Sequence, residues 1–171
     1  MVRPDIEKVP AFYKGYVELV QDMDLLDALR HAAKLVQQTV PYIAEDQGEY
    51  RYAEGKWSVK EVLNHIMDAE RVFAYRALRF ARKDETPLHP FEENDYAPEA
   101  NAHARSIQQH AREMKRLRET TIDLYLSFSP EMLEREGTAS GKKLSVKNLG
   151  YIIAGHEIHH LNILRERYLN P

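Results

Sequence analysis

Residues 145–164 read Ser-Val-Lys-Asn-Leu-Gly-Tyr-Ile-Ile-Ala-Gly-His-Glu-Ile-His-His-Leu-Asn-Ile-Leu. This stretch opens with Ser-Val-Lys, as another predicted helix does at residues 58–60, and its apolar residues recur at helical spacing. One seam along such a helix contains two imidazoles among aliphatic side chains: Leu149, Ile153, His156, His160 and Ile163. The stretch therefore predicts a long helix that faces the core of a helical bundle and carries histidines on its buried side.

The composition of the chain indicates the class of protein to which this helix belongs. The chain has 171 residues, of which 43% are hydrophobic and 30% charged, so we expect one globular domain over residues 1–171 with one core. The net charge of -3, with Lys and Arg scattered, gives no reason to expect nucleic-acid binding. Neither a secretory signal nor an apolar stretch long enough to span a membrane is present, so we expect a cytoplasmic protein with no membrane partner.

The seven Gly and eight Pro fall mostly between long helix-favouring stretches, which predicts an all-α chain. We expect four main helices near residues 24–44, 58–82, 98–128 and 145–168, the second starting with a capping box from Ser58 to Glu61. Shorter helices are expected at 10–20 and after Ser129, and a loop at 137–143. Helices of these lengths suit a four-helix bundle, with residues 83–97 as a long crossover between the second and third helices that can cover a pocket.

The histidines of the last helix indicate a metal site. His156 shares a helix face with both His159 and His160, and spacing alone does not choose between them. A catalytic type of site takes three protein ligands. On the second helix, His65 lies in the seam Val62, His65, Ala69 and Val72, so it is the candidate for the third ligand. Because the chain has no Cys, thiolate ligands are excluded. The competing interpretation is a hydrogen-bonded histidine network without metal.

Residues 156–160 also satisfy H-E-x-x-H, the pattern of zinc proteases in which Glu157 would be the general base. Such proteases draw their third ligand from well downstream, and few residues follow His160. No strand pattern predicts the substrate-binding sheet of a protease either. We therefore do not predict this class, and Glu157 is a weak catalytic candidate that can equally face solvent or another helix.

Two motifs together resemble a known family. Trp-Ser-Val-Lys-Glu-Val-Leu-Asn-His-Ile-Met-Asp-Ala-Glu at residues 57–70, followed by Gly-His-Glu-Ile-His-His at 155–160, is similar to the DinB superfamily. The resemblance implies a four-helix bundle in up-down-down-up order, a homodimer and a divalent metal held by three histidines. The ligands it implies are His65, His156 and His160, with His159 as their neighbour.

The resemblance also implies a function. We expect nickel or zinc ahead of manganese or iron, because imidazole ligands suit all four. A metal-dependent enzyme acting on a small molecule is expected, with low-molecular-weight thiol transfer ahead of hydrolysis. The alternative is a noncatalytic metal-binding or stress-response interaction protein with a structural metal. A fourth protein ligand would then complete the coordination of the metal.

Other side chains receive weaker expectations. Asp68 or Glu70 could orient a ligand imidazole, although ion pairs serve them equally well. The aromatic residues Tyr50, Tyr52 and Trp57 are expected to pack at one end of the bundle. The remaining histidines are expected outside the site: His31, His103 and His110 on helix surfaces, and His89 in a loop.

Overall fold

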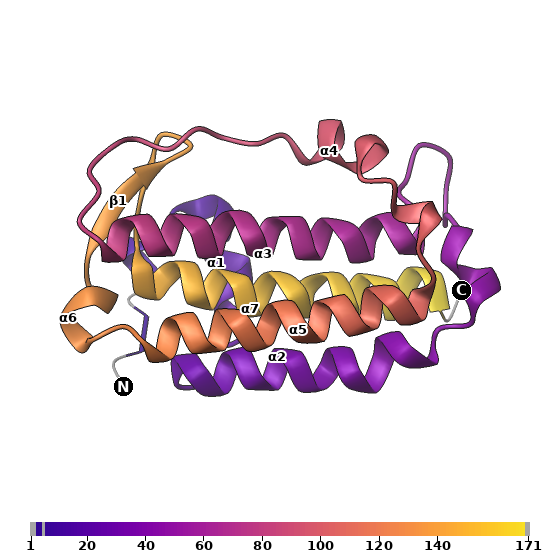
Figure 1. The fold of residues 1–171 in the computed structure, drawn as a ribbon, viewed down its shortest axis with the longest axis horizontal. Coiled ribbons are helices and arrows are strands. Elements are labelled where there is room, and N and C mark those ends of the chain that lie inside the picture. Colours follow the sequence, from indigo (N-terminus) through magenta and orange to yellow (C-terminus); the bar gives the residue numbers. More distant parts are fainter. Residues whose placement is uncertain (1–2, 5, 170–171) are drawn as a thin grey trace.

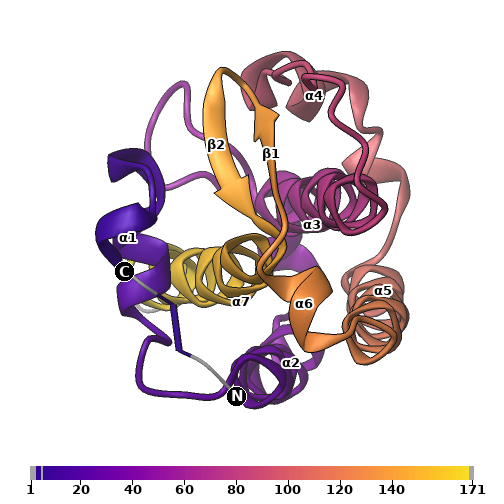
Figure 2. The ribbon, with the colours of Figure 1, turned by 90° about the vertical axis from the view of Figure 1, so that its left-hand side faces the viewer.

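The computed structural model describes residues 3–4 and 6–169. Four long helices form a bundle (Figure 1): α2 (Leu25–Thr39), α3 (Val59–Ala81), α5 (Ile107–Leu126) and α7 (Val146–Ile163). Both α5 and α7 pack against α2 and α3, so the helices occupy the corners of a square, which Figure 2 shows end on. The expected four-helix bundle is confirmed, and a capping box starts α3 as predicted, with the Glu61 amide donating to Ser58 Oγ at 3.2 Å.

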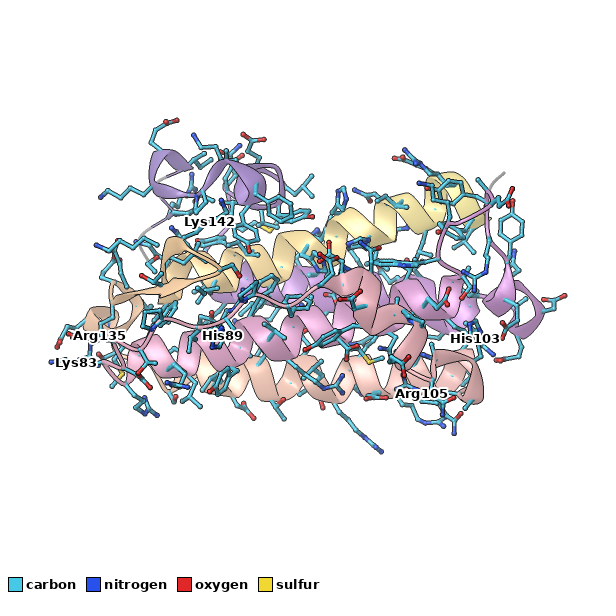
Figure 3. All side chains as sticks on the ribbon, turned by 90° about the horizontal axis from the view of Figure 1, so that it is seen from above. Lys83, His89, His103, Arg105, Arg135 and Lys142 are labelled. Atoms are coloured by element: carbon cyan, nitrogen blue, oxygen red, sulfur yellow. The ribbon has the colours of Figure 1, made fainter. Side chains whose placement is uncertain are left out.

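Residues 82–106 return along the outside of α3, so α3 and α5 point in the same direction, opposite to α2 and α7 (Figure 1). Lys83 lies at one end of the bundle, whereas His103 and Arg105 lie at the other (Figure 3). This connection contains α4 (Glu93–Glu99) and a short 3-10 turn (Ala102–Ala104). It crosses the bundle beside α3 and can contribute side chains to a site there.

Our expectation that the third helix begins at Pro98 was wrong. Pro98 lies inside α4, and the chain then passes through Asn101, whose φ of 49° is left-handed and ends the helical run. The long helix α5 begins instead after Ser106, whose hydroxyl accepts a hydrogen bond from the Gln109 amide at 3.1 Å. The capping box at Ser106 thus marks the true start of this helix.

The loop expected at residues 137–143 is a hairpin. Strands β1 (Glu136–Ala139) and β2 (Lys142–Ser145) pair antiparallel, joined by Ser140 and Gly141, which both have positive φ. Positive φ at both central residues matches the twist of a two-residue hairpin, and Ser-Gly was the signal for it in the sequence. The hairpin places Ser140 next to α3.

The smaller elements lie around the four long helices. Helix α1 (Ala11–Glu18) packs on α7, and α6 (Pro130–Leu133) precedes the hairpin. Short 3-10 turns lie at Ile6–Lys8, Val40–Tyr42 and Glu45–Glu49, and a π-helical turn at Leu164–Leu169 extends α7. Within the described part of the chain, no helix is long and apolar enough to cross a membrane.

A single buried arginine connects the four long helices. Arg118 of α5 is 2% exposed, and its Nε and Nη2 each donate to one carboxylate oxygen of Glu70 on α3 at 2.9 Å. Its Nη1 lies 2.8 Å from Glu157 Oε2 of α7 and donates to the Leu29 carbonyl oxygen of α2 at 3.0 Å. The bundle core therefore contains a charged centre that contacts all four long helices.

Gly155 allows α1 to approach α7 closely. A Cβ atom at this position would overlap the carbonyl oxygen of Tyr16, which is backbone and cannot rotate away. We expect Gly155→Ala to lower the free energy of unfolding by about 1–3 kcal/mol, because α1 must move outward. Thermal or urea unfolding measures this.

The matched control is Gly15→Ala in α1, where an added Cβ meets nothing within 4 Å. Alanine favours helix over glycine by up to about 1 kcal/mol, so this variant should be unchanged or more stable. Equal stability of the two variants would contradict the close approach of α1 to α7.

Candidate metal centre

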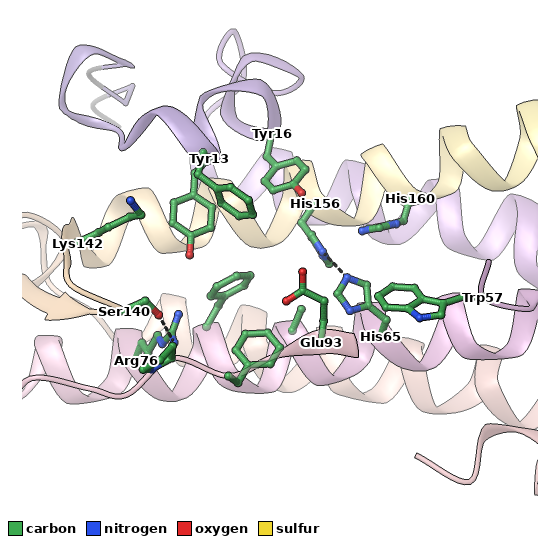
Figure 4. A pocket seen from close by; sticks show the side chains of 15 residues that line it. Tyr13, Tyr16, Trp57, His65, Arg76, Glu93, Ser140, Lys142, His156 and His160 are labelled. Carbon is green, nitrogen blue, oxygen red and sulfur yellow. Dashed lines mark hydrogen bonds between the residues drawn. The ribbon is translucent and has the colours of Figure 1, made fainter. Parts of the chain in front are cut away.

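Three imidazoles from two helices converge inside the bundle. His65 extends from α3, and His156 and His160 extend from α7 (Figure 4). The Nε2 atoms of His65 and His156 lie 3.0 Å apart, and one ring nitrogen of each of the three histidines lies within 4.8 Å of the others. Periodicity alone allowed His159 or His160, and the structure places His160 in the group.

Burial keeps these rings uncharged. It lowers the pKa of His65 to about 4 and that of His160 to about 3, and it holds the pKa of His156 well below its usual range. For His156 and His160, the neighbouring imidazoles lower the pKa further. Neutral rings keep a lone pair on one nitrogen, which is the form that binds a metal ion.

The three histidines fit a divalent transition-metal ion. Two imidazole nitrogens bound to one ion at about 2.1 Å lie about 3.0–3.5 Å from each other, and the His65–His156 separation of 3.0 Å falls in this range. Nitrogen donors without thiolates suit zinc, nickel, iron and related ions. A hydrogen bond between two rings would account for this one contact but not for the third imidazole beside it.

Aromatic side chains hold the histidines in place. The Tyr16 ring meets His156 edge-on at a centroid distance of 5.3 Å, and it also contacts His159 at 5.1 Å. Trp57, which we expected only to pack at the end of the bundle, lies 4.8 Å from the His65 ring. The prediction for Tyr50 and Tyr52 is borne out, since both rings pack on Tyr168.

A cavity of about 320 Å³ opens onto the three histidines. Its walls come from α1, α3, α7, the start of α4, the hairpin and the connection between α3 and α4 (Figure 4). Most of the wall is aromatic: Phe12, Tyr13, Tyr16, Trp57, Phe73 and Phe91. Four polar side chains interrupt it: Arg76, Glu93, Ser140 and Lys142. The expectation that residues 83–97 could cover a pocket agrees with this arrangement.

Glu93 is a functional candidate that the sequence reasoning missed. It begins α4, and its carboxylate points into the cavity beside His65 and His156 (Figure 4). Its charge contributes, after burial, to the raised pKa of Tyr16, which keeps the Tyr16 hydroxyl protonated. The acidic run at residues 92–95 was the available signal, but nothing in that run distinguishes the residue that faces inward.

The carboxylates next to the histidines in sequence lie elsewhere. Glu157 and Glu70 both pair with Arg118 in the core, and burial raises the pKa of Glu157 to about 7. Asp68 accepts a hydrogen bond from Asn64 Nδ2 at 2.6 Å and forms an ion pair with Arg71. None of these three carboxylates lines the cavity, so the H-E-x-x-H match does not place a general base there.

The remaining histidines also lie outside the site. His31, His89 and His103 are exposed, and His103 lies beside Glu49. The prediction for His110 was wrong: this residue is fully buried, with Nδ1 lying 3.0 Å from the Ser106 carbonyl oxygen. The start of α5, where His110 lies, packs against the 3-10 turn at Val40–Tyr42.

Sequence comparison identifies the family. The model of the DinB superfamily matches residues 25–164, which include all four bundle helices and the three histidines. The chain belongs to the DinB superfamily. Two proteins of Oceanobacillus iheyensis, each named "Putative metal-dependent hydrolase", are similar to this DinB chain. One is 28% identical over 152 residues, covering 87% of each chain, and the other is 25% identical over 128 residues, covering 72% of each.

Solved structures show that this DinB chain shares its fold with proteins of low sequence identity. YfiT from Bacillus subtilis, described as a probable metal-dependent hydrolase with an unusual four-helix bundle topology, superposes with a TM-score of 0.76 at 17% identity. That match covers 96% of this chain and 90% of YfiT. A mycothiol-dependent maleylpyruvate isomerase superposes with a TM-score of 0.65 at 14% identity, covering 94% of this chain and 62% of the isomerase.

Proposed function

We propose that this DinB protein is a metal-dependent enzyme whose divalent ion is held by His65, His156 and His160. The observation that carries the proposal is the convergence of three neutral imidazoles on a 320 Å³ cavity. Among the described residues, no fourth histidine or carboxylate joins the group, whereas a structural site is closed by four protein ligands. This open arrangement supports an enzyme over a noncatalytic structural site.

A bound divalent ion supplies Lewis acidity, lowering the pKa of a water or thiol that reaches it. The protein's own groups around it have complementary roles. The Glu93 carboxylate in the cavity is placed to accept a proton, and the protonated Tyr16 hydroxyl is placed to donate a hydrogen bond. The aromatic walls exclude water, which strengthens these interactions.

Hydrolysis of a small molecule is the first reaction to test, because the relatives from Oceanobacillus and Bacillus are named for it. Transfer of a low-molecular-weight thiol is the second. It is supported by the shared fold of the mycothiol-dependent isomerase and by the affinity of zinc and related ions for thiolate ligands. In both reactions Glu93 would accept the proton of the nucleophile.

Elemental analysis of protein purified without an affinity tag, combined with activity screens, tests the proposal. We expect about one divalent ion per chain after reconstitution. We also expect either hydrolysis of substrates in an ester and amide panel or conjugation of small thiols to electrophiles, and a chelator should abolish the activity. We expect Glu93→Gln to keep the metal and lose at least about 100-fold in turnover, as removal of a general base does. Glu92→Gln, the exposed neighbour, is the matched control. Less than about 0.1 ion per chain would refute the proposal.

A further inference from the structure

Two arginines are almost completely buried, and their surroundings differ. Arg118, 2% exposed, pairs with two carboxylates. Arg76 of α3 is 1% exposed, and no carboxylate of the described residues lies within ion-pair distance of it. Its Nη2 donates to two neutral acceptors at 3.0 Å, the His89 carbonyl oxygen and Ser140 Oγ, and the neutral Tyr13 hydroxyl interacts with the guanidinium. Its Nη1 is buried and has no acceptor at hydrogen-bond distance among the described residues.

A buried guanidinium without an anion is unfavourable, because it stays protonated and has lost its hydration. The rings of Phe73 and Phe91 lie 5.7 and 5.9 Å from the Arg76 guanidinium carbon, close enough for cation–π attraction. These contacts offset part of the cost but supply no negative charge. The arginine therefore has an unused capacity to bind an anion.

Arg76 lines the same cavity as the three histidines, and the two lie at opposite ends of it (Figure 4). Lys142 of the hairpin adds a second positive charge at the Arg76 end. Among the described residues, a single carboxylate, Glu93, lines the cavity, and it lies toward the histidines. The charges are thus separated along the cavity, with both cations at the end away from the metal-binding candidates.

We propose that Arg76 and Lys142 form a subsite for the carboxylate or phosphate group of a small ligand whose apolar part lies against Phe73 and Phe91. The substrate class is an anion on an apolar stem. This orientation rests on the proposed function: with its anionic group at Arg76, the ligand would extend its reacting bond toward His65, His156 and His160. The cavity volume of about 320 Å³ suits a ligand of this size.

Trp57 provides a direct probe, because it is the only Trp in the chain and lines the cavity. Metal-free protein would be titrated with phenylacetate, phenyl phosphate and the uncharged phenylacetamide, following Trp57 fluorescence. We expect phenylacetate or phenyl phosphate to bind at least about tenfold more tightly than phenylacetamide, the ratio expected for a charge-assisted hydrogen bond. The relative affinities of the first two ligands distinguish a carboxylate subsite from a phosphate subsite.

Variants test which residue gives the preference. Arg76→Gln should remove the preference for the anion, and Lys142→Ala should reduce it several-fold. Arg135→Gln is the matched control, since Arg135 is a partly buried arginine at the end of the bundle that also donates to a backbone carbonyl (Figure 3). This control should bind as the unmodified protein does. If Arg76→Gln does not fold, the comparison of charged and uncharged ligands and the Lys142→Ala variant still test whether the subsite binds an anion.

Equal affinities for the charged and uncharged ligands would overturn the subsite, as would no saturable binding of any of them. A preference that survives in folded Arg76→Gln would overturn it too. Because these titrations use metal-free protein, their outcome is independent of metal binding. Anion binding without metal uptake would support the anion subsite and refute the proposed metal-dependent enzyme. Metal uptake without a preference for anions would refute the subsite and leave the proposed enzyme function in place.

Discussion

Replacing His160 with alanine will lower the affinity of the protein for zinc or nickel by more than about 100-fold. Loss of a residue that merely orients a ligand typically costs 10- to 100-fold in metal affinity, so loss of one of three ligands should cost at least this much. His65→Ala and His156→Ala are expected to behave in the same way, because all three rings belong to one group. Competition titrations against a chromophoric chelator, with tag-free protein, measure the affinity.

His159→Ala is the control for this experiment. His159 precedes His160 on α7 and has the same side chain, but its ring packs on Tyr16 and is not one of the three that converge. Its removal should change metal affinity by less than about threefold, within the usual range for a residue that neither binds nor orients the ion. If the His159→Ala and His160→Ala variants lost affinity equally, the assignment of ligands would be wrong.

Arg118→Met will lower the free energy of unfolding by about 3–5 kcal/mol, the usual result of removing one partner from a buried ion pair. The substitution keeps much of the side-chain volume but leaves Glu70 and Glu157 as two carboxylates buried side by side in the core. It also removes the donor to the Leu29 carbonyl oxygen, so α2 loses a buried hydrogen bond to α5. Urea unfolding followed by circular dichroism measures the change.

The control is Arg71→Met on the outer face of α3. Arg71 also pairs with two carboxylates, Asp68 and Glu113, but its side chain is 43% exposed. Surface pairs of this kind contribute at most about 1 kcal/mol, because water screens the charges. A loss below about 1 kcal/mol in Arg118→Met would show that the buried network does not hold the four helices together.

Residue patterns predicted most of the helices and failed where the backbone changes direction. The starts of α3 and α7 follow from Ser58 and Ser145, since a capping serine at the head of a periodic stretch is a local signal. The start of α5 was missed because Pro98 is a plausible first residue of a helix, yet here it lies inside the short helix α4. The hairpin was missed because four-residue strands are too short to show alternation.

The candidate site was likewise predicted only in part from the sequence. Apolar spacing along two helices was enough to predict that His65 and His156 face inward, because a helix holds its side chains at a fixed angle about its own axis. How each helix is rotated against its neighbours depends on packing between distant segments. That rotation brings His160 to the other two imidazoles, directs Glu157 to Arg118, and encloses Arg76 and Glu93 in a cavity formed by segments that are far apart in the sequence.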